Sequence, residues 1–292
     1  MNTKKNIAFA MSVSLIASMT LALSGCNPTP PEVTEVYTPK VETSVETTIV
    51  TTEETEPPLV LLPEAQERME RYEHYAGWIN IPGIVDEPIV QYSDNDYYLN
   101  RNPDQQKDIA GSIYADFRCI LNTRKRSGNI VLYGHNQKDG SRFGQLDFYK
   151  WNPLTYYQQK PVVYVDTAYE KRVYKICSMF IINTKPEHDT RPLFDYHNYI
   201  DLTDEARFNE FADQIKKRSL LVIPDVDVQY GDRFITLSTC STEFESSRFV
   251  IIARELREGE SAEVDTSTAK VNDNPLYPEI IYKYQGGSYR EE

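Results

Sequence analysis

Three side chains in this sequence are of the types that carry out acyl transfer through a covalent intermediate. Cys240 follows a β-rich run over residues 235–239, Arg248 begins the next β-rich run eight positions later, and His135 follows a third run over 129–134. A thiolate attacks carbonyl carbons, and histidine is its usual proton partner. Arginine keeps its charge and can stabilise an oxyanion. Because all three lie at predicted strand ends, adjacent strands could bring them to one point.

The motifs around these residues resemble those of the sortases, transpeptidases that attach secreted proteins to the Gram-positive cell wall. The segment Thr236-Leu237-Ser238-Thr239-Cys240, with its distant histidine and following arginine, has the sortase pattern. Four more segments are similar, in order, to the class B branch: Gly77-Trp78-Ile79-Asn80-Ile81-Pro82-Gly83, Asn95-Asp96-Tyr97-Tyr98-Leu99, Gly111-Ser112-Ile113-Tyr114-Ala115-Asp116 and Tyr133-Gly134-His135-Asn136. The resemblance covers residues 63–257, which we take as the catalytic domain.

The resemblance implies a mainly β fold with added helices, a closed sortase barrel of about eight strands. One helix would precede the barrel, and another would lie in the loop before the last strands. Pro63 and Glu64 open a predicted helix over residues 63–76, which Gly77 would end. The β-rich runs lie around 129–134, 161–166, 171–182, 220–223, 233–239 and 248–256. Their alternation and β-branched content favour a mostly antiparallel barrel.

A second helix is predicted after Thr203, which would be its N-cap. Phe208, Phe211 and Ile215 fall on one face of this helix, and basic residues at 216–218 complement its C-terminal end. Its position is similar to that of the extra class B helix that borders the substrate groove. A helix that only plugs one end of the barrel fits the pattern equally well.

The resemblance also implies a role for each residue of the trio. Cys240 would attack the carbonyl carbon, His135 would donate and later accept the proton of the amine, and Arg248 would stabilise the oxyanion or clamp the substrate backbone. Glu243 lies near Cys240, but a solvated turn residue is favoured over an acid that orients His135. The eight-residue step from Cys240 to Arg248 is shorter than in some class B members.

Four further residues are candidate substrate contacts. Ser238, two positions before Cys240, projects from the same strand face and could either contact substrate or pack. Asn95, Leu99 and Tyr133 match class B positions that line the peptide groove. Packing would also explain Leu99 and Tyr133.

The N-terminus resembles a lipoprotein signal peptide. Lys4 and Lys5 precede an apolar run over residues 7–23, and Leu23-Ser24-Gly25-Cys26 is similar to a lipobox. Cleavage would remove residues 1–25 and leave a lipidated Cys26. The alternative is an uncleaved transmembrane anchor, for which the run is short. Either anchor would hold the enzyme on the extracytoplasmic face of the cell membrane of a Gram-positive bacterium.

Two polar segments flank the predicted domain. Residues 26–62 are rich in Thr, Glu and Pro, with Lys40 the only base. This composition cannot bury a core and predicts a disordered tether. Residues 258–292 form a polar C-terminal tail, in which we expect mostly disorder.

Charge and cysteine content exclude several classes of partner. The net charge is −13 and becomes −15 once Lys4 and Lys5 are removed with residues 1–25, which argues against nucleic acid. The four histidines show no metal-ligand spacing, so we expect no metal and no cofactor. Cys119 and Cys177 are too few for a disulfide framework, and we expect both to be small core or surface residues.

The resulting prediction is a class B-like sortase. Class B enzymes cleave Asn-Pro-x-Thr sorting signals, so this chain would cleave a C-terminal signal of a secreted protein after Thr through a thioacyl-enzyme. It would then transfer the acyl group to an amine of a peptidoglycan precursor (lipid II) or of a pilin. Two alternatives stay open: a cysteine endopeptidase without transfer, and a surface lipoprotein that binds peptides without turnover.

Overall fold

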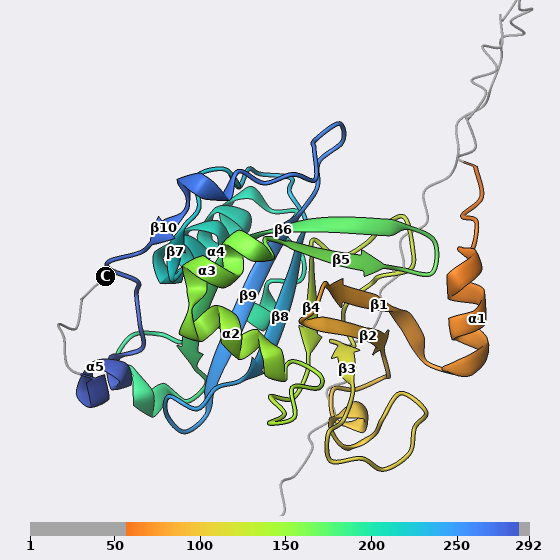
Figure 1. Cartoon of the computed structure of the whole chain (residues 1–292), viewed down its shortest axis with the longest axis horizontal. Helices are drawn as coiled ribbons and strands as arrows, with labels where there is room; N and C mark the ends of the chain where they lie inside the picture. The colour runs from red at the N-terminus through yellow and green to blue at the C-terminus, as the bar shows by residue number, and fades with distance from the viewer. Residues whose placement is uncertain (1–56, 286–292) are drawn as a thin grey trace, which may run out of the picture. The chain divides into compact units, whose positions relative to one another are not determined.

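The computed structural model describes residues 57–285, and eight of their strands close into a barrel (Figure 1). The order around the barrel is β1-β2-β3-β4-β8-β9-β6-β5. The strands are β1 (Tyr75–Ile81), β2 (Val85–Val90), β3 (Ile113–Ala115), β4 (Asn129–Tyr133), β5 (Val162–Asp166), β6 (Lys171–Asn183), β8 (Phe234–Cys240) and β9 (Ser247–Glu255). The predicted closed, mainly antiparallel barrel is confirmed, with two parallel pairs, β2–β3 and β4–β8.

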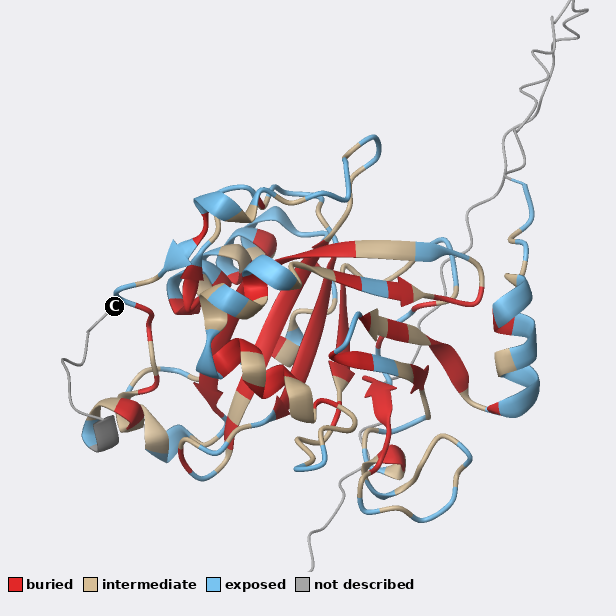
Figure 2. Cartoon of the chain, viewed as in Figure 1, coloured by how far each residue is buried: buried red, intermediate tan, exposed pale blue. Residues whose placement is uncertain are grey.

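Side chains that alternate along the strands form two separate clusters. Leu237 and Ile251 point into the barrel, where they are fully buried in its core. Phe180 and Val250 point outward and are also buried, because a helix covers this face of β6, β8 and β9. Figure 2 shows the barrel strands largely in the buried colour. The strands around the candidate site are therefore packed on both faces.

The covering helix is α4 (Glu205–Arg218), which buries Phe208 and Phe211 against β6 and β9. It lies on the outer face of the barrel and does not plug an end. The predicted N-cap was wrong by one residue, because the Asp204 carboxylate accepts the hydrogen bond of the Arg207 backbone N–H at 2.8 Å. The Thr203 hydroxyl instead donates to Asp201 at 2.7 Å.

The first helix, α1 (Pro63–Arg71), is shorter than the predicted 63–76 because β1 begins at Tyr75. Gly77 is a strand residue opposite Ile89 and does not end the helix. A Cβ at position 77 would lie 2.7 Å from the carbonyl oxygen of Asp166, so the glycine permits the close approach of the chain at the end of β5.

The remaining elements fill the connections between the strands. They are α2 (Asp147–Trp151), α3 (Pro153–Gln159), α5 (Glu279–Gln285) and the 3₁₀ turns η1 (Tyr97–Asn100), η2 (Gly144–Leu146), η3 (Pro186–His188), η4 (Tyr196–Asn198) and η5 (Thr266–Thr268). The expected strand around 220–223 is β7 (Leu221–Val222). It pairs with β10 (Lys270–Val271) outside the barrel.

Residues 258–285 are folded onto the domain, so the expectation of disorder was wrong for them. Leu276 and Ile281 are buried, and the Leu276 backbone N–H donates to Lys217 O at 2.9 Å. Glu260 forms ion pairs with Arg254 and Lys175. The polar composition of this segment wrongly suggested disorder, because Glu260 and a few apolar side chains bind to the rest of the domain.

The predicted signal peptide, Cys26 and nearly all of the tether lie outside the described residues. Within residues 57–285, no helix has the length and apolar character needed to cross a membrane.

Candidate active site

Strand pairing places Cys240 and Arg248 directly opposite each other. They are register partners in the antiparallel β8–β9 pair, so their side chains leave the same face of the sheet. Opposite residues in such a pair have Cβ atoms about 4.5–5.5 Å apart. Cys240 is exposed at the last position of β8. The thiol therefore faces solvent beside a guanidinium.

The parallel pairing of β4 with β8 brings His135 to the same point. Tyr133 lies opposite Ser238, and the Gly134 backbone N–H donates to Ser238 O at 3.2 Å. His135 Nε2 is 2.8 Å from the carbonyl oxygen of Leu99. A carbonyl only accepts, so Nε2 carries the proton of the neutral ring. Nδ1 is then the basic nitrogen available to the Cys240 thiol.

The three groups shift one another's ionisation. A side-chain hydrogen bond with His135 holds the pKa of the Cys240 thiol below its ordinary value; burial opposes this effect, and the charge of Arg248 reinforces it. The same hydrogen bond raises the pKa of His135, against burial and with help from the Leu99 carbonyl. Both directions favour a thiolate beside an imidazolium, the form in which cysteine is nucleophilic.

The guanidinium of Arg248 is available to an anionic ligand. It is half-buried and donates to the adjacent Ser247 carbonyl at 3.2 Å. No carboxylate of the described residues lies within 4.0 Å of it. Its charge can therefore act on an oxyanion that forms next to Cys240.

Leu99 contributes to the site through its backbone. Its carbonyl fixes the tautomer of His135, a role that its apolar side chain could not indicate. Gly111 makes this contact possible, because a Cβ there would lie 2.6 Å from Leu99 O and 3.0 Å from His135 Cδ2. Its φ of +61° also favours glycine. Gly111 opens one of the motifs noted in the sequence, but its residue type alone does not indicate which backbone group approaches it.

Asn95 and Tyr133 converge on Asp116, a fully buried carboxylate that the sequence analysis did not assign to the site. Asn95 Nδ2 donates to Asp116 Oδ2 at 3.0 Å and the Tyr133 hydroxyl donates at 2.9 Å. Burial opposes ionisation of Asp116, but the hydrogen bonds from Arg118, Tyr133 and Asn95 together outweigh it and lower the pKa of Asp116 to about 2. Asp116 therefore braces both predicted substrate contacts from behind.

Ser238 is buried, and its hydroxyl hydrogen-bonds that of Tyr196 at 2.6 Å. This contact favours the packing interpretation of Ser238. Tyr114 on β3 is a second residue that the sequence analysis missed. It is buried opposite Tyr133 with the ring centroids 5.4 Å apart. Burial raises the pKa of its phenol, and the charge of Arg248 opposes this shift.

Glu243 pairs with Lys150, the ammonium of which lies 2.9 Å from Glu243 Oε1. Glu243 does not orient His135, but the favoured interpretation of a solvated turn residue was wrong, because its side chain is mostly buried in an ion pair. Cys119 and Cys177 are free, and burial raises the pKa of each thiol to about 12.

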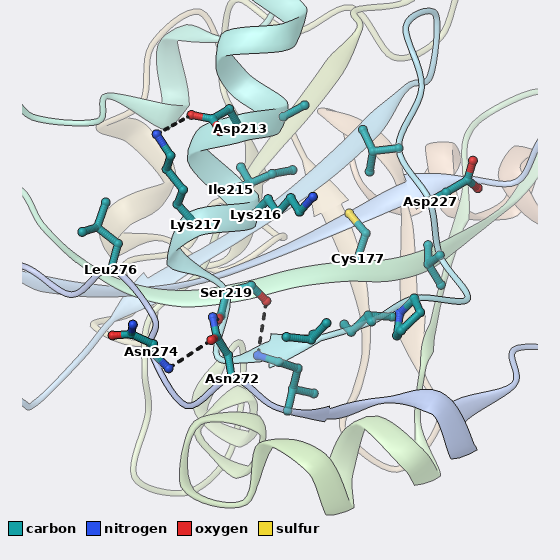
Figure 3. A pocket seen from close by; sticks show the side chains of 17 residues that line it. Cys177, Asp213, Ile215, Lys216, Lys217, Ser219, Asp227, Asn272, Asn274 and Leu276 are labelled. Carbon is teal, nitrogen blue, oxygen red and sulfur yellow. Dashed lines mark hydrogen bonds and ion pairs between the residues drawn. The ribbon is translucent and has the colours of Figure 1, made fainter. Parts of the chain in front are cut away.

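A large cavity of about 1030 Å³ lies apart from this trio, between α4, β7 and residues 272–276 (Figure 3). Its wall includes Cys177 and the ion pair of Lys217 with Asp213 at 2.8 Å, but none of Cys240, His135 and Arg248. Within residues 57–285, no group of three His, Cys, Asp or Glu side chains is arranged to hold a metal ion.

Comparison with known proteins agrees with this geometry. A family model of the sortase domain matches residues 79–256. Sortase B of Listeria monocytogenes is 34% identical over 185 residues, which cover 60% of this chain and 67% of that protein. The chain belongs to the sortase B family. Sortase B of Staphylococcus aureus is 30% identical over 61% of this chain and 68% of that protein.

Solved sortase B structures share the fold. The Staphylococcus aureus sortase B–substrate complex superposes with a TM-score of 0.58 and 26% identity, over 68% of this chain and 87% of that one. Clostridium perfringens sortase B superposes with a TM-score of 0.54 and 28% identity, over 66% and 99%. This sortase B family member is therefore a cysteine transpeptidase built on the closed barrel described above.

The coupling of Cys240 to His135 predicts the pH dependence of thiol alkylation. The alkylation rate of Cys240 rises as the pH passes through its pKa, so the midpoint should lie below about 8.5, the value of a free thiol. His135→Ala removes the hydrogen bond and should raise the midpoint. Rates measured with iodoacetamide and peptide mass mapping of Cys240 provide the test. An equal midpoint in both proteins would contradict the coupling.

Proposed function

We propose that this chain cleaves a C-terminal sorting signal of a secreted protein after Thr and transfers the threonyl acyl group to an amine. The observation that carries the proposal is the convergence of Cys240, Arg248 and His135 through the register of three adjacent strands. The tautomer of His135 also supports the proposal. Because Nε2 carries the proton, Nδ1 is the nitrogen free to exchange a proton with the Cys240 thiol.

In the first half-reaction, the Cys240 thiolate attacks the threonyl carbonyl carbon and forms a C–S bond. Arg248 stabilises the oxyanion of the tetrahedral intermediate, because its charge is permanent and its donors are fixed. The C–N bond then breaks, and the leaving amine takes a proton from His135. The product is a thioacyl-enzyme and a free C-terminal fragment.

In the second half-reaction, an acceptor amine attacks the thioester carbonyl. His135 accepts the proton of the amine, the C–S bond breaks, and the Cys240 thiolate is restored. Family resemblance supports an amine of lipid II or of a pilin as the acceptor. Asn95, Leu99 and Tyr133 lie on the β3–β4 side of the trio, which supports this side as the peptide groove.

The partition of product between acid and amide tests the reaction class. A peptide that carries an Asn-Pro-x-Thr signal should yield a free acid in buffer and increasingly an amide when triglycine or diaminopimelate is added, because the amine competes with water for the thioester. Cys240→Ala should lose both products, and mass spectrometry measures each. Cleavage that gives only acid at every amine concentration would support an endopeptidase instead.

We further propose that Cys26 is the lipidated N-terminus of the mature protein. The lipobox-like Leu23-Ser24-Gly25-Cys26 and the basic residues before the apolar run support this anchor. It would hold the domain on the extracytoplasmic face of a Gram-positive membrane, since two acyl chains give stable attachment.

The N-terminal mass of the protein isolated from cells tests the anchor. A chain that begins at diacylated Cys26 is expected, and Cys26→Ala should retain residues 1–25. An intact N-terminus without lipid on the wild-type protein would indicate a transmembrane anchor instead.

A further inference from the structure

A cluster of buried ions lies beside the nucleophile and has no part in the reaction steps above. Lys150 Nζ on α2 is 2.9 Å from Asp147 Oδ1, 2.9 Å from Glu243 Oε1 and 3.2 Å from Ser241 Oγ. Lys150 is 8% exposed and Asp147 is 6% exposed. Burial opposes ionisation of Glu243, but the hydrogen bonds from Ser241 and Lys150 together hold its pKa below its ordinary value. We call these four residues the Lys150 cluster.

Asn136 connects the Lys150 cluster to Cys240. Its side-chain nitrogen donates one hydrogen bond to Asp147 Oδ2 at 3.0 Å and one to the carbonyl oxygen of Cys240 at 3.0 Å. An amide nitrogen has two hydrogens, so both are used. Because Asn136 directly follows His135, its two bonds hold the backbone of the nucleophile against the backbone of its proton partner.

The Lys150 cluster also fixes the loop over residues 241–246, which joins β8 to β9. Ser241 and Glu243 contact Lys150 at the start of this loop. Its later part is held by buried Phe244, whose carbonyl accepts from the Ser247 hydroxyl at 2.8 Å. This loop determines the step from Cys240 to Arg248. Both ends of this loop are therefore anchored. Its first end is held by Lys150, which lies in the segment that follows His135.

Buried ions are a poor source of stability, because removal of the charges from water offsets their mutual attraction. The directional contacts of these ions say more about which chain segments they hold in place. The Lys150 cluster joins the segment after His135 to the segment after Cys240. Asp147 accepts a hydrogen bond from Asn136, which follows His135, and Lys150 contacts Ser241 and Glu243, which follow Cys240. An apolar cluster could pack as well, but it could not bind the Cys240 carbonyl through Asn136.

We propose that the Lys150 cluster and Asn136 are positioning residues that set the Cys240 thiol against His135 and Arg248. This proposal rests on the function proposed above, in which Cys240 is the nucleophile. Loss of the positioning should lower kcat more than it changes KM, because displacement of a reacting group by about 1 Å can cost about 10²-fold in rate. A weaker bond to His135 should also raise the pH midpoint of Cys240 alkylation.

The sign of that pH shift separates positioning from plain electrostatics. The titratable groups that act on the pKa of the Cys240 thiol are His135 and Arg248. The nearby phenols of Tyr114 and Tyr196 carry no charge in this range, because burial raises the pKa of each. The cluster adds two carboxylates and one ammonium. Removal of its net negative charge alone would lower the midpoint, whereas displacement of the thiol from His135 would raise it.

Two variants of the full-length protein test the proposal. Lys150→Met alone would leave two buried carboxylates unpaired, so the triple variant Asp147→Asn, Lys150→Met, Glu243→Gln removes all the charges together. Asn136→Ala breaks the contact with the Cys240 carbonyl and leaves the ions intact. Lys171→Met, which breaks the exposed pair with Glu64, is the matched control. Melting temperature, kcat and KM for transpeptidation, and the alkylation midpoint are measured for each.

We expect both test variants to fold, to lose about 10- to 100-fold in kcat with little change in KM, and to show a raised alkylation midpoint. The control should match the wild type. Folded variants with unchanged kcat and midpoint, or with a lowered midpoint, would overturn the proposal. If the triple variant does not fold, Asn136→Ala decides alone. If the wild type lacks transpeptidase activity, the proposed function fails, while the alkylation midpoint still tests positioning because it needs no substrate.

Discussion

Strand β8 is shared by two different pairings, and the geometry of the candidate site depends on both. Its parallel pairing with β4 sets where His135 emerges, and its antiparallel pairing with β9 sets Arg248 opposite Cys240. A slip of one residue in either pairing would turn the side chains of β8 to the other face. Leu237 would then leave the core and Cys240 would enter it. Burial of Leu237 and Ile251 inside the barrel therefore protects the register that the chemistry requires.

Strand register places His135 but does not orient its ring. A backbone carbonyl, that of Leu99, orients it. The Leu99 carbonyl lies 2.8 Å from His135 Nε2, and Gly111 has no side chain that would obstruct it. No carboxylate is needed to select the tautomer. Asp116 accepts hydrogen bonds from Asn95 and Tyr133 and so holds these two side chains beside the trio. Lys150 holds the loop after Cys240 through Glu243. Backbone contacts thus orient the trio, and buried charges support the segments that carry it.

Much of this arrangement was predictable from the sequence, because strands such as β8 and β9 carry dense apolar and β-branched patterns that end at Cys240 and begin near Arg248. Other strands left weaker patterns. β2 contains Pro88, and β3 spans only Ile113–Ala115, so neither has the length or composition of a clear strand. These strands depend on partners that are distant in sequence.

Contacts made by backbone atoms were not predictable for a different reason. The carbonyl of Leu99 and the hydrogen bond from Asn136 to Cys240 depend on chain direction, which side-chain type does not encode. Nothing in the sequence around Lys150 distinguishes it from a surface lysine. Its burial beside Glu243 appears only when residues about 90 positions apart meet at one barrel edge. The folded segment 258–285 was missed because its few buried side chains are spaced irregularly.

The central claim is that Cys240 forms a covalent bond with the acyl group during turnover. The most direct measurement is the intact mass of the enzyme mixed briefly with a sorting-signal peptide and quenched in acid, followed by peptide mapping. We expect a mass increase on Cys240 equal to that of the peptide acid ending in Thr minus one water, and we expect this adduct to disappear when an acceptor amine is added. Turnover of the peptide with no adduct on Cys240, or with the acyl group on another residue, would contradict it.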